Sequence, residues 1–490
     1  MQRITIKTGG LVFALLGAVS MPMSLIAAGV DFPTTCSTNA DAEVDDGLTL
    51  LHNMMYIEAE AAFGRAAEAD PDCAMAQWGI AMANFHPLWP GTPSDDEKAR
   101  GTAAAERLAN MTPGSDLEQA FANAVAAFYA SDHADYRARL AAWAKAQQAA
   151  QEKIPENIDA AALSALARLA TAPSGPDRIE ENARVGDVLD VLHKTAPDHP
   201  GVIHYAIHAY DNPPLKDRGL PYAEIYDTAA PAAAHALHMP AHIFTRTGDW
   251  LKSIDLNRRS AEAALGTSQD VVQTHYVHAI DYMVYGHLQM GDIAKAERLV
   301  DEMLAIDNHQ VSFGGAYALA ASPVRLLLEQ GQWAEAAALS PAMHATIPWE
   351  NFPQAAAMLW FAKGLGAART NDIATARAAA SELTRLHDSM QKQGQDYWAR
   401  LTEGQLLTVE GWMELAEGNN EVALAQQKKA ADLEDEIGKS PVTPGHVLPA
   451  RELLGDMLSE LGRTEEADEA YRATLAHSPN RARSLAALNR

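Results

Sequence analysis

Cysteine, basic side chains and long apolar runs are all scarce in this 490-residue chain, and each scarcity excludes a kind of site or partner. Cys36 and Cys73 are the only cysteines, and neither belongs to a sequence motif of metal ligands, so cysteine ligation of a metal is not favoured. In an oxidising compartment, two cysteines favour one disulfide. Two distant free thiols are the alternative.

Basic residues are fewer than acidic ones, because the chain has 38 Lys and Arg and 64 Asp and Glu, which gives a net charge of −26. A protein that binds duplex nucleic acid needs a basic face to neutralise phosphates, and none is evident. We therefore expect no nucleic-acid partner. The same net charge favours solubility.

Only one long apolar stretch occurs, from Leu11 to about Ile26. It follows a short basic region and ends in small residues, which is the pattern of a secretory signal peptide over residues 1–28. A retained membrane anchor is the alternative. No other segment reaches the ~20 apolar residues needed to cross a bilayer. The sequence thus predicts a periplasmic or secreted protein with no membrane association after cleavage.

Motifs of several common enzyme classes are absent. No glycine-rich phosphate loop follows a predicted strand, and the chain contains neither HExxH nor GxSxG. Hydrolase chemistry of these motif types is therefore unsupported.

Alanine is abundant, which favours helix, and a helical pattern recurs along the chain. The clearest unit is residues 448–479, LPARELLGDMLSELGRTEEADEAYRATLAHSP, in which Gly455 permits close helix approach and Gly462 ends the first helix. This unit resembles the tetratricopeptide repeat (TPR), a helix pair of about 34 residues. The resemblance implies an all-α, TPR-like α-solenoid of stacked helix pairs.

Weaker copies of the unit precede it, with turns at Gly248, Gly291, Gly331, Asn371 and Gly418. The resemblance covers most of residues 40–90 and 200–480, whereas residues 90–195 are helical but only loosely repeat-like. The sequence therefore predicts three regions after the signal peptide. They are an N-terminal helical region (29–195), a histidine-rich region of repeats (196–345) and a C-terminal region of repeats with a capping helix (346–490).

Histidine is unevenly distributed, because seven of the 18 histidines lie between residues 204 and 278. Most of these occur in the strings HPGVIHYAIHAYDNP (199–213), HALHMPAHIFTRTGDW (235–250) and HAIDYMVYGHLQMGD (278–292). The strings look like those of a group of exported bacterial TPR proteins. That resemblance implies the architecture and no particular activity.

The repeat spacing places many of these residues at equivalent positions. His204 and His238 lie 34 residues apart at repeat position 5, and His208 and His242 lie 34 residues apart at position 9, counted back from the turn glycines. In the TPR family, side chains at positions 2, 5 and 9 line the concave groove, and the resemblance implies the same here. The next unit has Asp281 at position 5 and Tyr285 at position 9, and position 2 is filled by His235 and His278.

We therefore predict a metal site whose ligands are His204, His208, His235, His238, His242, His278 and Asp281. Neighbouring helices lie about 8–10 Å apart, so long imidazoles can converge on one ion. Imidazole with a carboxylate suits copper, zinc or iron, and an open coordination position is typical of a catalytic centre. Tyr285 is the candidate proton donor. A groove for a non-metal ligand and structural hydrogen bonding are the alternatives.

Three neighbouring residues each have two interpretations. Pro240 either bends a helix and so aims the histidines, or marks a helix start near Met239. Asp211 either orients an imidazole or is a turn residue. Arg325, at position 9 of the following unit, either meets an anionic substrate or is solvated.

Three functions fit these features. The first is an exported metal-dependent enzyme that acts on a small molecule or peptide in the groove, with the ion activating water or dioxygen. The second is a TPR scaffold that binds a peptide or protein partner without catalysis. The third is metal storage or delivery.

Overall fold

The computed structural model describes residues 29–89, 92–130, 135–173, 175–268 and 271–490. In this part of the chain the regular structure is helical, and the only β-type pairing is an isolated bridge between Val272 and His309. The predicted all-α fold is therefore confirmed. The signal peptide predicted for residues 1–28 lies outside the described residues.

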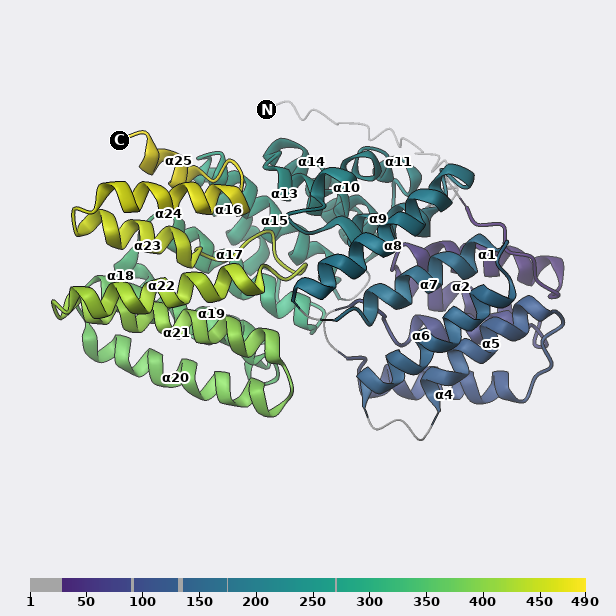
Figure 1. The fold of residues 1–490 in the computed structure, drawn as a ribbon. Coiled ribbons are helices and arrows are strands. Elements are labelled where there is room, and N and C mark those ends of the chain that lie inside the picture. Colours follow the sequence, from purple (N-terminus) through teal and green to yellow (C-terminus); the bar gives the residue numbers. More distant parts are fainter. Residues whose placement is uncertain (1–28, 90–91, 131–134, 174, 269–270) are drawn as a thin grey trace, which may run out of the picture.

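The N-terminal part of the fold, at the right of Figure 1, is built from helix pairs in which α1 packs on α2, α5 on α6 and α7 on α8. The bounds of its helices are α1 Thr38–His52, α2 Tyr56–Ala69, α3 Ala74–Ala83, α4 Asp95–Ala109, α5 Asp116–Tyr129, α6 Tyr136–Lys153, α7 Ile158–Ala170 and α8 Pro176–Thr195.

The middle helices carry the histidine strings and join the two ends of the molecule (Figure 1). Their bounds are α9 Pro200–Tyr210, α10 Lys216–Ala223, α11 Tyr226–Ala229, α12 Ala234–His238, α13 Pro240–Thr247, α14 Trp250–Thr267, α15 Thr274–Gln289, α16 Ile293–Leu304, α17 Phe313–Glu329 and α18 Trp333–Ala338.

The C-terminal helices form the left side of Figure 1 and continue the stack. Their bounds are the 3₁₀ helix η1 Trp349–Asn351, α19 Pro353–Arg369, α20 Ile373–Lys392, α21 Asp396–Ala416, α22 Asn420–Ile437, α23 Ala450–Glu460, α24 Thr464–His477 and α25 Ala482–Leu488. Because α8 packs on α9 and α18 packs on α19, the stack continues across the boundaries predicted at residues 195 and 345.

The turns between paired helices have the backbone that the repeat requires. The turn residues have φ between 62° and 86° at Gly248, Gly291, Gly331, Asn371, Gly418 and Gly462. Glycine adopts this left-handed region without strain and asparagine tolerates it. Each turn separates two helices that pack on each other, such as α23 and α24 around Gly462. The predicted TPR-like α-solenoid is therefore confirmed.

Pro240 interrupts a helical run without ending it. It is the first residue of α13, and Met239 before it keeps helical backbone angles. Because proline has no N–H to continue the hydrogen-bond ladder, the run over residues 234–247 is divided into α12 and α13. Pro240 therefore starts a short helix, as in the second interpretation, whereas a bend that aims the histidines stays a prediction.

A disulfide ties the N-terminal segment to the first repeats. Cys36 and Cys73 are bonded, with their Cα atoms 4.9 Å apart, and no free cysteine occurs among the described residues. The bridge joins the segment before α1 to the N-cap of α3. The predicted disulfide is thus confirmed, and the alternative of two free thiols is wrong.

The end of the chain returns to the middle of the stack. α25 packs on α15, and the backbone N–H of Ala482 donates to Gln289 Oε1 at 3.0 Å. Nearby, Trp250 Nε1 donates to the carbonyl of Asn480 at 3.3 Å, and Asn480 Nδ2 donates to the carbonyl of Gly248 at 3.2 Å. The last repeat therefore contacts a repeat that carries histidines.

Residues 438–449, here called the groove segment, extend from α22 towards the middle helices before α23 begins (Figure 1). Arg325 on α17 holds this segment. Its Nη1 donates to the carbonyl of His446 at 3.0 Å, and its Nη2 donates to Thr443 Oγ1 at 2.5 Å and to the carbonyl of Gly445 at 2.8 Å. Arg325 is fully buried, so both interpretations of it were wrong. Its donors are occupied by its own chain.

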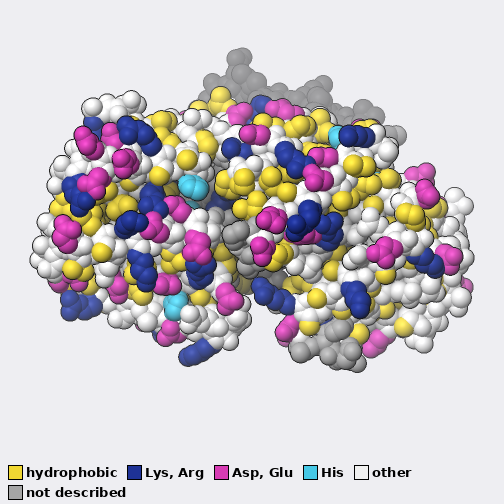
Figure 2. All heavy atoms as spheres, in the orientation of Figure 1, with side chains coloured by type: hydrophobic (Ala, Val, Ile, Leu, Met, Phe, Trp, Pro, Cys, Tyr) yellow, Lys and Arg dark blue, Asp and Glu magenta, His cyan; other side chains and the backbone are white. Residues whose placement is uncertain are grey.

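None of the helices in the described ranges is long and apolar enough to cross a membrane. On the face drawn in Figure 2, acidic and basic side chains are interspersed and histidine occupies only small areas. The clustered histidines lie inside the stack instead, where most of them are buried.

Candidate metal centre

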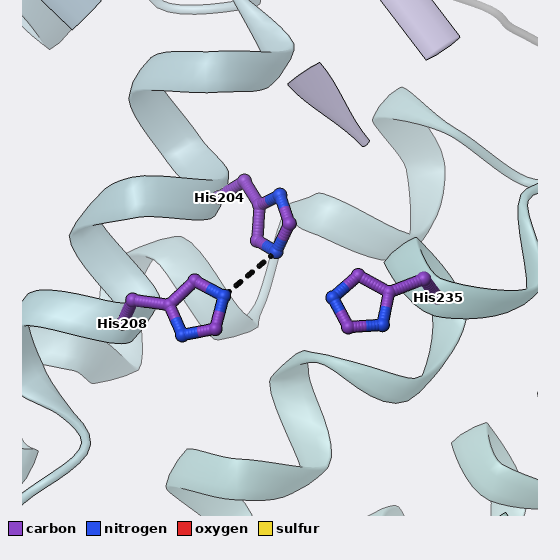
Figure 3. Close-up of side chains that lie close together, drawn as sticks. All are labelled: His204, His208 and His235. Atoms are coloured by element: carbon purple, nitrogen blue, oxygen red, sulfur yellow. Dashed lines mark hydrogen bonds between the residues drawn. The ribbon is translucent and has the colours of Figure 1, made fainter. Parts of the chain in front are cut away.

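The structure gathers the predicted histidines into two groups of three. In triad A, ring nitrogens of His204, His208 and His235 lie within 4.8 Å of one another, and triad B brings together His238, His242 and His278 within the same limit. Figure 3 shows His204 and His208 pointing together from one helix towards His235 on another. The rings of His208 and His242 are 6.4 Å apart between centroids, so the two triads adjoin.

Both triads follow the same repeat rule. Each combines the histidines at positions 5 and 9 of one unit with the position 2 histidine of the next. Histidines four residues apart on a helix already face each other, so the next helix needs to supply only one more ring. Residues at the same repeat position, such as His204, His238 and Asp281 at position 5, therefore do not form the groups seen in the structure.

Triad B contains two imidazoles whose protons are fixed by their neighbours. Nδ1 of His238 lies 2.7 Å from Asn257 Oδ1, and the amide of Asn257 is oriented by donating from Nδ2 to the carbonyl of Ser253 at 2.7 Å. Nδ1 of His242 lies 2.8 Å from Asp211 Oδ2. Both Nδ1 atoms must donate, so in the neutral rings both Nε2 atoms carry a lone pair. These two Nε2 atoms are 2.8 Å apart.

Triad A is fixed at one ring and unpartnered at another. Nδ1 of His204 donates to the carbonyl of His52 at 2.7 Å, which leaves a lone pair on Nε2, 3.1 Å from Nε2 of His208. A proton on His208 can fill this contact as an ordinary hydrogen bond. His235 is buried, and neither of its ring nitrogens has a hydrogen-bond partner.

Burial lowers the pKa of every triad histidine, and neighbouring imidazoles or cations lower it further. Asp211 partly offsets this lowering of the pKa for His242, as hydrogen bonds do for His204 and His238. The pKa of His204 and of His278 falls to about 3. The pKa values of His235 and His238 lie well below the ordinary histidine value for the same reason. The rings are therefore neutral near pH 7, which is the form that binds a metal ion.

Asp211 orients His242 and is itself held by two cations. Its Oδ1 accepts from Arg246 Nε at 2.8 Å and lies 3.6 Å from Lys439 Nζ. Burial alone would raise the pKa of Asp211, but Lys439, Arg246 and His242 hold it well below its usual range. Asp211 is thus a carboxylate that accepts the Nδ1 proton of His242, in agreement with the first of the two interpretations of this residue.

Asp281 and Tyr285 contact residues outside the triads, and Asp281 Oδ2 has no hydrogen-bond partner. Asp281 Oδ1 accepts from Arg325 Nε at 3.0 Å and from Ser322 Oγ at 3.1 Å. Tyr285 packs against Trp250 and Arg325 and lies so close to Gly445 that a Cβ there would be 2.8 Å from its hydroxyl. The roles predicted for these two residues, as ligand and as proton donor, gain no support from their positions.

Tyr282 lies where Tyr285 was expected. Its ring centroid is 4.6 Å from that of His238 and 5.3 Å from that of His278. The spacing of four residues from His278 is the sequence signal that could have identified it. Its hydroxyl donates to the carbonyl of Pro441 at 3.1 Å, so Tyr282 links triad B to the groove segment.

A third group, His52, Asp159 and His199, has ligand-like spacing but is satisfied by hydrogen bonds. Nε2 of His52 and Nε2 of His199 lie 2.9 Å and 3.1 Å from the same Asp159 oxygen. Nδ1 of His199 accepts from the backbone N–H of Val202, and Nδ1 of His52 lies 2.9 Å from the hydroxyl of Tyr205. Each ring nitrogen has a partner, so this group needs no metal ion.

Trp89 forms one wall beside triad A. Its ring centroid is 5.2 Å from that of His235 and 5.6 Å from that of His275. Asn257 and Lys439, by contrast, come from segments that no sequence spacing connects to the histidines. Only the packing of α14 and of the groove segment places them near triad B.

No known family model matches the chain, and no curated protein matches it in sequence. Its structure is similar to a Rap protein complexed with competence and sporulation factor, at 12% identity and a TM-score of 0.37, covering 91% of this chain and 100% of that one. It is also similar to human IFIT1, as a dimer with m7Gppp-AAAA, at 13% identity and a TM-score of 0.41, covering 90% of this chain and 95% of that one. Its similarity to yeast Tom70 has 11% identity and a TM-score of 0.37, covering 92% of this chain and 94% of that one. All three are TPR-type helical-repeat proteins. These scores carry no functional inference, and the TPR-like fold is assigned from the helix pairs of this chain.

Proposed function

We propose that this protein is an exported metalloenzyme that holds one transition-metal ion in each histidine triad. The observation that supports the proposal most is the 2.8 Å contact between Nε2 of His238 and Nε2 of His242, whose Nδ1 protons are both committed elsewhere. Two lone pairs at this distance repel each other unless a cation lies near both. A proton is disfavoured, because burial lowers the pKa of both rings, so a metal ion is the cation that fits.

His235 supports the same proposal for triad A. An unpartnered buried polar group costs about 1–3 kcal/mol, and both ring nitrogens of His235 are in that state. A metal ion shared with His204 and His208 would satisfy one of them. Two nitrogens that bind one zinc ion tetrahedrally lie about 3.3 Å apart, close to the 3.1 Å between the Nε2 atoms of these two histidines. The 2.8 Å contact in triad B is shorter and is closer to the ~2.9 Å between two ligands at right angles, as in a five- or six-coordinate ion.

Three protein ligands leave at least one coordination position open, which is typical of catalytic rather than structural zinc sites. An all-imidazole ligand set suits zinc, copper or iron. Such an ion, when bound, supplies an activated water or a site for dioxygen. The chain itself fixes the ring tautomers through Asn257 and Asp211 and covers triad B with Tyr282.

We infer that a ligand reaches the triads from the side on which Trp89 and His275 lie. His208 and His278 of the triads and the neighbouring His275 keep partial solvent exposure, whereas the other four triad rings are buried. We infer that a small molecule or the end of a peptide approaches from this side. The disulfide between Cys36 and Cys73 is typical of an oxidising compartment, which supports export.

A peptide-binding scaffold is the second candidate function. The groove segment, in which most side chains are buried, already lies against α17 and uses the donors of Arg325. An external peptide at this position would have to displace it. This observation favours the metalloenzyme over a scaffold that binds peptide at Arg325. Metal storage, the third candidate, requires ions that exchange freely without turnover.

Metal analysis of the full chain, purified without a histidine tag, tests the proposal. We expect about two equivalents of a transition metal per chain, one for each triad. His204→Ala and His238→Ala should each remove one equivalent. His199→Ala, from the hydrogen-bonded group, is the matched control and should leave the metal content unchanged.

The outcomes separate the three functions. Absence of stoichiometric metal, with folding unaffected in both triad variants, contradicts metal binding and leaves the scaffold. Metal that exchanges completely with a weak chelator, without any metal-dependent turnover of model esters, peptides or phenols, indicates storage. Tightly held metal with turnover that falls in the His238→Ala variant supports the enzyme.

A further inference from the structure

A cavity of about 60 Å³ lies apart from the triads, between α13, α24 and the groove segment. Residues that line it include Thr245 and Arg246 of α13, Lys439 and His446 of the groove segment, and Tyr285 of α15. None of the triad histidines lines this cavity. A buried water molecule needs about 10–15 Å³ of such cavity volume, so the cavity has room for roughly four to six atoms of the size of a water oxygen.

Lys439 places a cation that has no hydrogen-bond partner at the wall of this cavity. Its side chain is 7% exposed, and its Nζ makes no hydrogen bond. The nearest carboxylate oxygen is Asp211 Oδ1 at 3.6 Å, which is an ion-pair distance and too long for a hydrogen bond. An ammonium group has three donors, and burying them without acceptors is costly. A ligand that accepts hydrogen bonds would remove this cost.

The charges around the cavity do not balance. Asp211 is shared among Arg246, Lys439 and His242. Of the acidic residues that line the cavity, Asp435 is paired with Arg451 at 2.9 Å. Below the pKa of about 7 that burial gives Lys439, one positive charge therefore remains beside the cavity.

The other acidic residue of the wall, Glu434, is neutral near pH 7. Burial raises the pKa of its carboxyl to about 8, and Oε1 accepts from the backbone N–H of Ala450 at 2.8 Å. Glu434 therefore does not cancel the excess positive charge.

We propose that this cavity binds a small oxyanion, either a carboxylate or a phosphate group, through Lys439 and Arg246. Arginine and lysine are the usual partners of both groups, and four to five non-hydrogen atoms, as in acetate or phosphate, match the space. The site is distinct from the triads and does not depend on the metal ions of the proposed function. Asp211 connects the two sites, because it contacts Lys439 on one side and His242 on the other.

Titration calorimetry on the full chain, freed of metal with a chelator, tests this site with sodium acetate in one arm and sodium phosphate in the other. At about pH 6, below the pKa of about 7 that burial gives Lys439, this residue is charged. We expect one saturable equivalent of one of the two anions. Lys439→Met should weaken it at least tenfold, a loss of about 1.4 kcal/mol. Lys429→Met, an exposed lysine, is the control.

Two further variants keep the test decisive if Lys439→Met fails to fold. Lys439→Arg keeps the charge and should retain binding, whereas Ser478→Leu narrows the cavity without removing a charge and should weaken binding. Saturation by acetate assigns a carboxylate ligand, and saturation by phosphate assigns a phosphate ligand. Absence of saturable binding in the unmodified chain, or equal binding in the Lys439→Met or Ser478→Leu variant, overturns the proposal. Because metal is absent throughout, neither result depends on whether the triads bind metal.

Discussion

The Nε2 atoms of His238 and His242 lie 2.8 Å apart, although each ring donates its proton from Nδ1 to a different acceptor. The acceptors, Asn257 and Asp211, come from α14 and from the segment after α9. Two elements that are separate in sequence therefore fix the tautomers of an i, i+4 pair, and they do so in the way that leaves the lone pairs of both Nε2 atoms next to each other.

Removal of the charge on Asp211 should weaken metal binding at triad B alone. In Asp211→Asn, the acceptor for His242 Nδ1 is neutral, so the imidazole is a less basic ligand, and we expect a loss of about 10–100-fold in affinity. Chelator competition on each variant measures this. Asp190→Asn is the control, because Asp190 accepts from Tyr210 and Tyr222 and contacts no triad histidine. An equal loss in both variants would indicate a general effect on stability.

The unpartnered ring of His235 should be replaceable at little cost to the metal-free fold. In His235→Phe the aromatic packing on Trp89 and His204 is kept and two unsatisfied nitrogens are removed. We expect the metal-free variant to be at least as stable as the unmodified chain, by thermal unfolding. Added metal should stabilise the variant less, because one ion fewer binds to the folded state. Equal stabilisation of both proteins by metal would rule out His235 as a ligand.

The contact between the last repeat and the middle of the stack can be measured at a turn glycine. Gly248→Ala places a Cβ 2.7 Å from the carbonyl of Pro479, in addition to the strain of φ +74°. Gly291→Ala has a similar φ of +72° and meets nothing within 4 Å. Urea unfolding should give a loss of about 1–2 kcal/mol for Gly291→Ala and about 1–3 kcal/mol more for Gly248→Ala. Equal losses would mean that residues 479–480 do not dock on this turn in solution.

Glu434 should make stability depend on pH. Burial raises its pKa from 4.5 to about 8 in the folded protein. Between these values the folded state binds more protons than the unfolded state, so stability falls as the pH rises from about 4.5 to about 8. The loss is at most about 5 kcal/mol. Denaturant unfolding at several pH values should show this loss in the unmodified chain and in Glu421→Gln, an exposed control. The loss should be smaller in Glu434→Gln.

The repeat spacing was a strong guide to the fold and a partial guide to the site. Gly248, Gly291 and Gly462 mark turns that need a left-handed backbone, and this requirement is local to each glycine. The 34-residue offset likewise identified which histidines are equivalent, because equivalent positions on equivalent helices have the same orientation. Asp281 satisfied the same counting rule, yet its partner is Arg325, because the helix packed against its face carries an arginine and no histidine.

The sequence by itself therefore determined the helices, their turns, the disulfide-forming pair and six histidines on the inner positions of consecutive repeats. Each of these depends on residues within one or two repeats of one another. Only the tertiary structure decided how the histidines divide into triads, that Asn257 and Asp211 set the tautomers, and that Lys439 is buried beside Asp211. These relationships depend on how one repeat is rotated against the next and on where residues 438–449 return to the stack. Both are set by side-chain packing between distant segments.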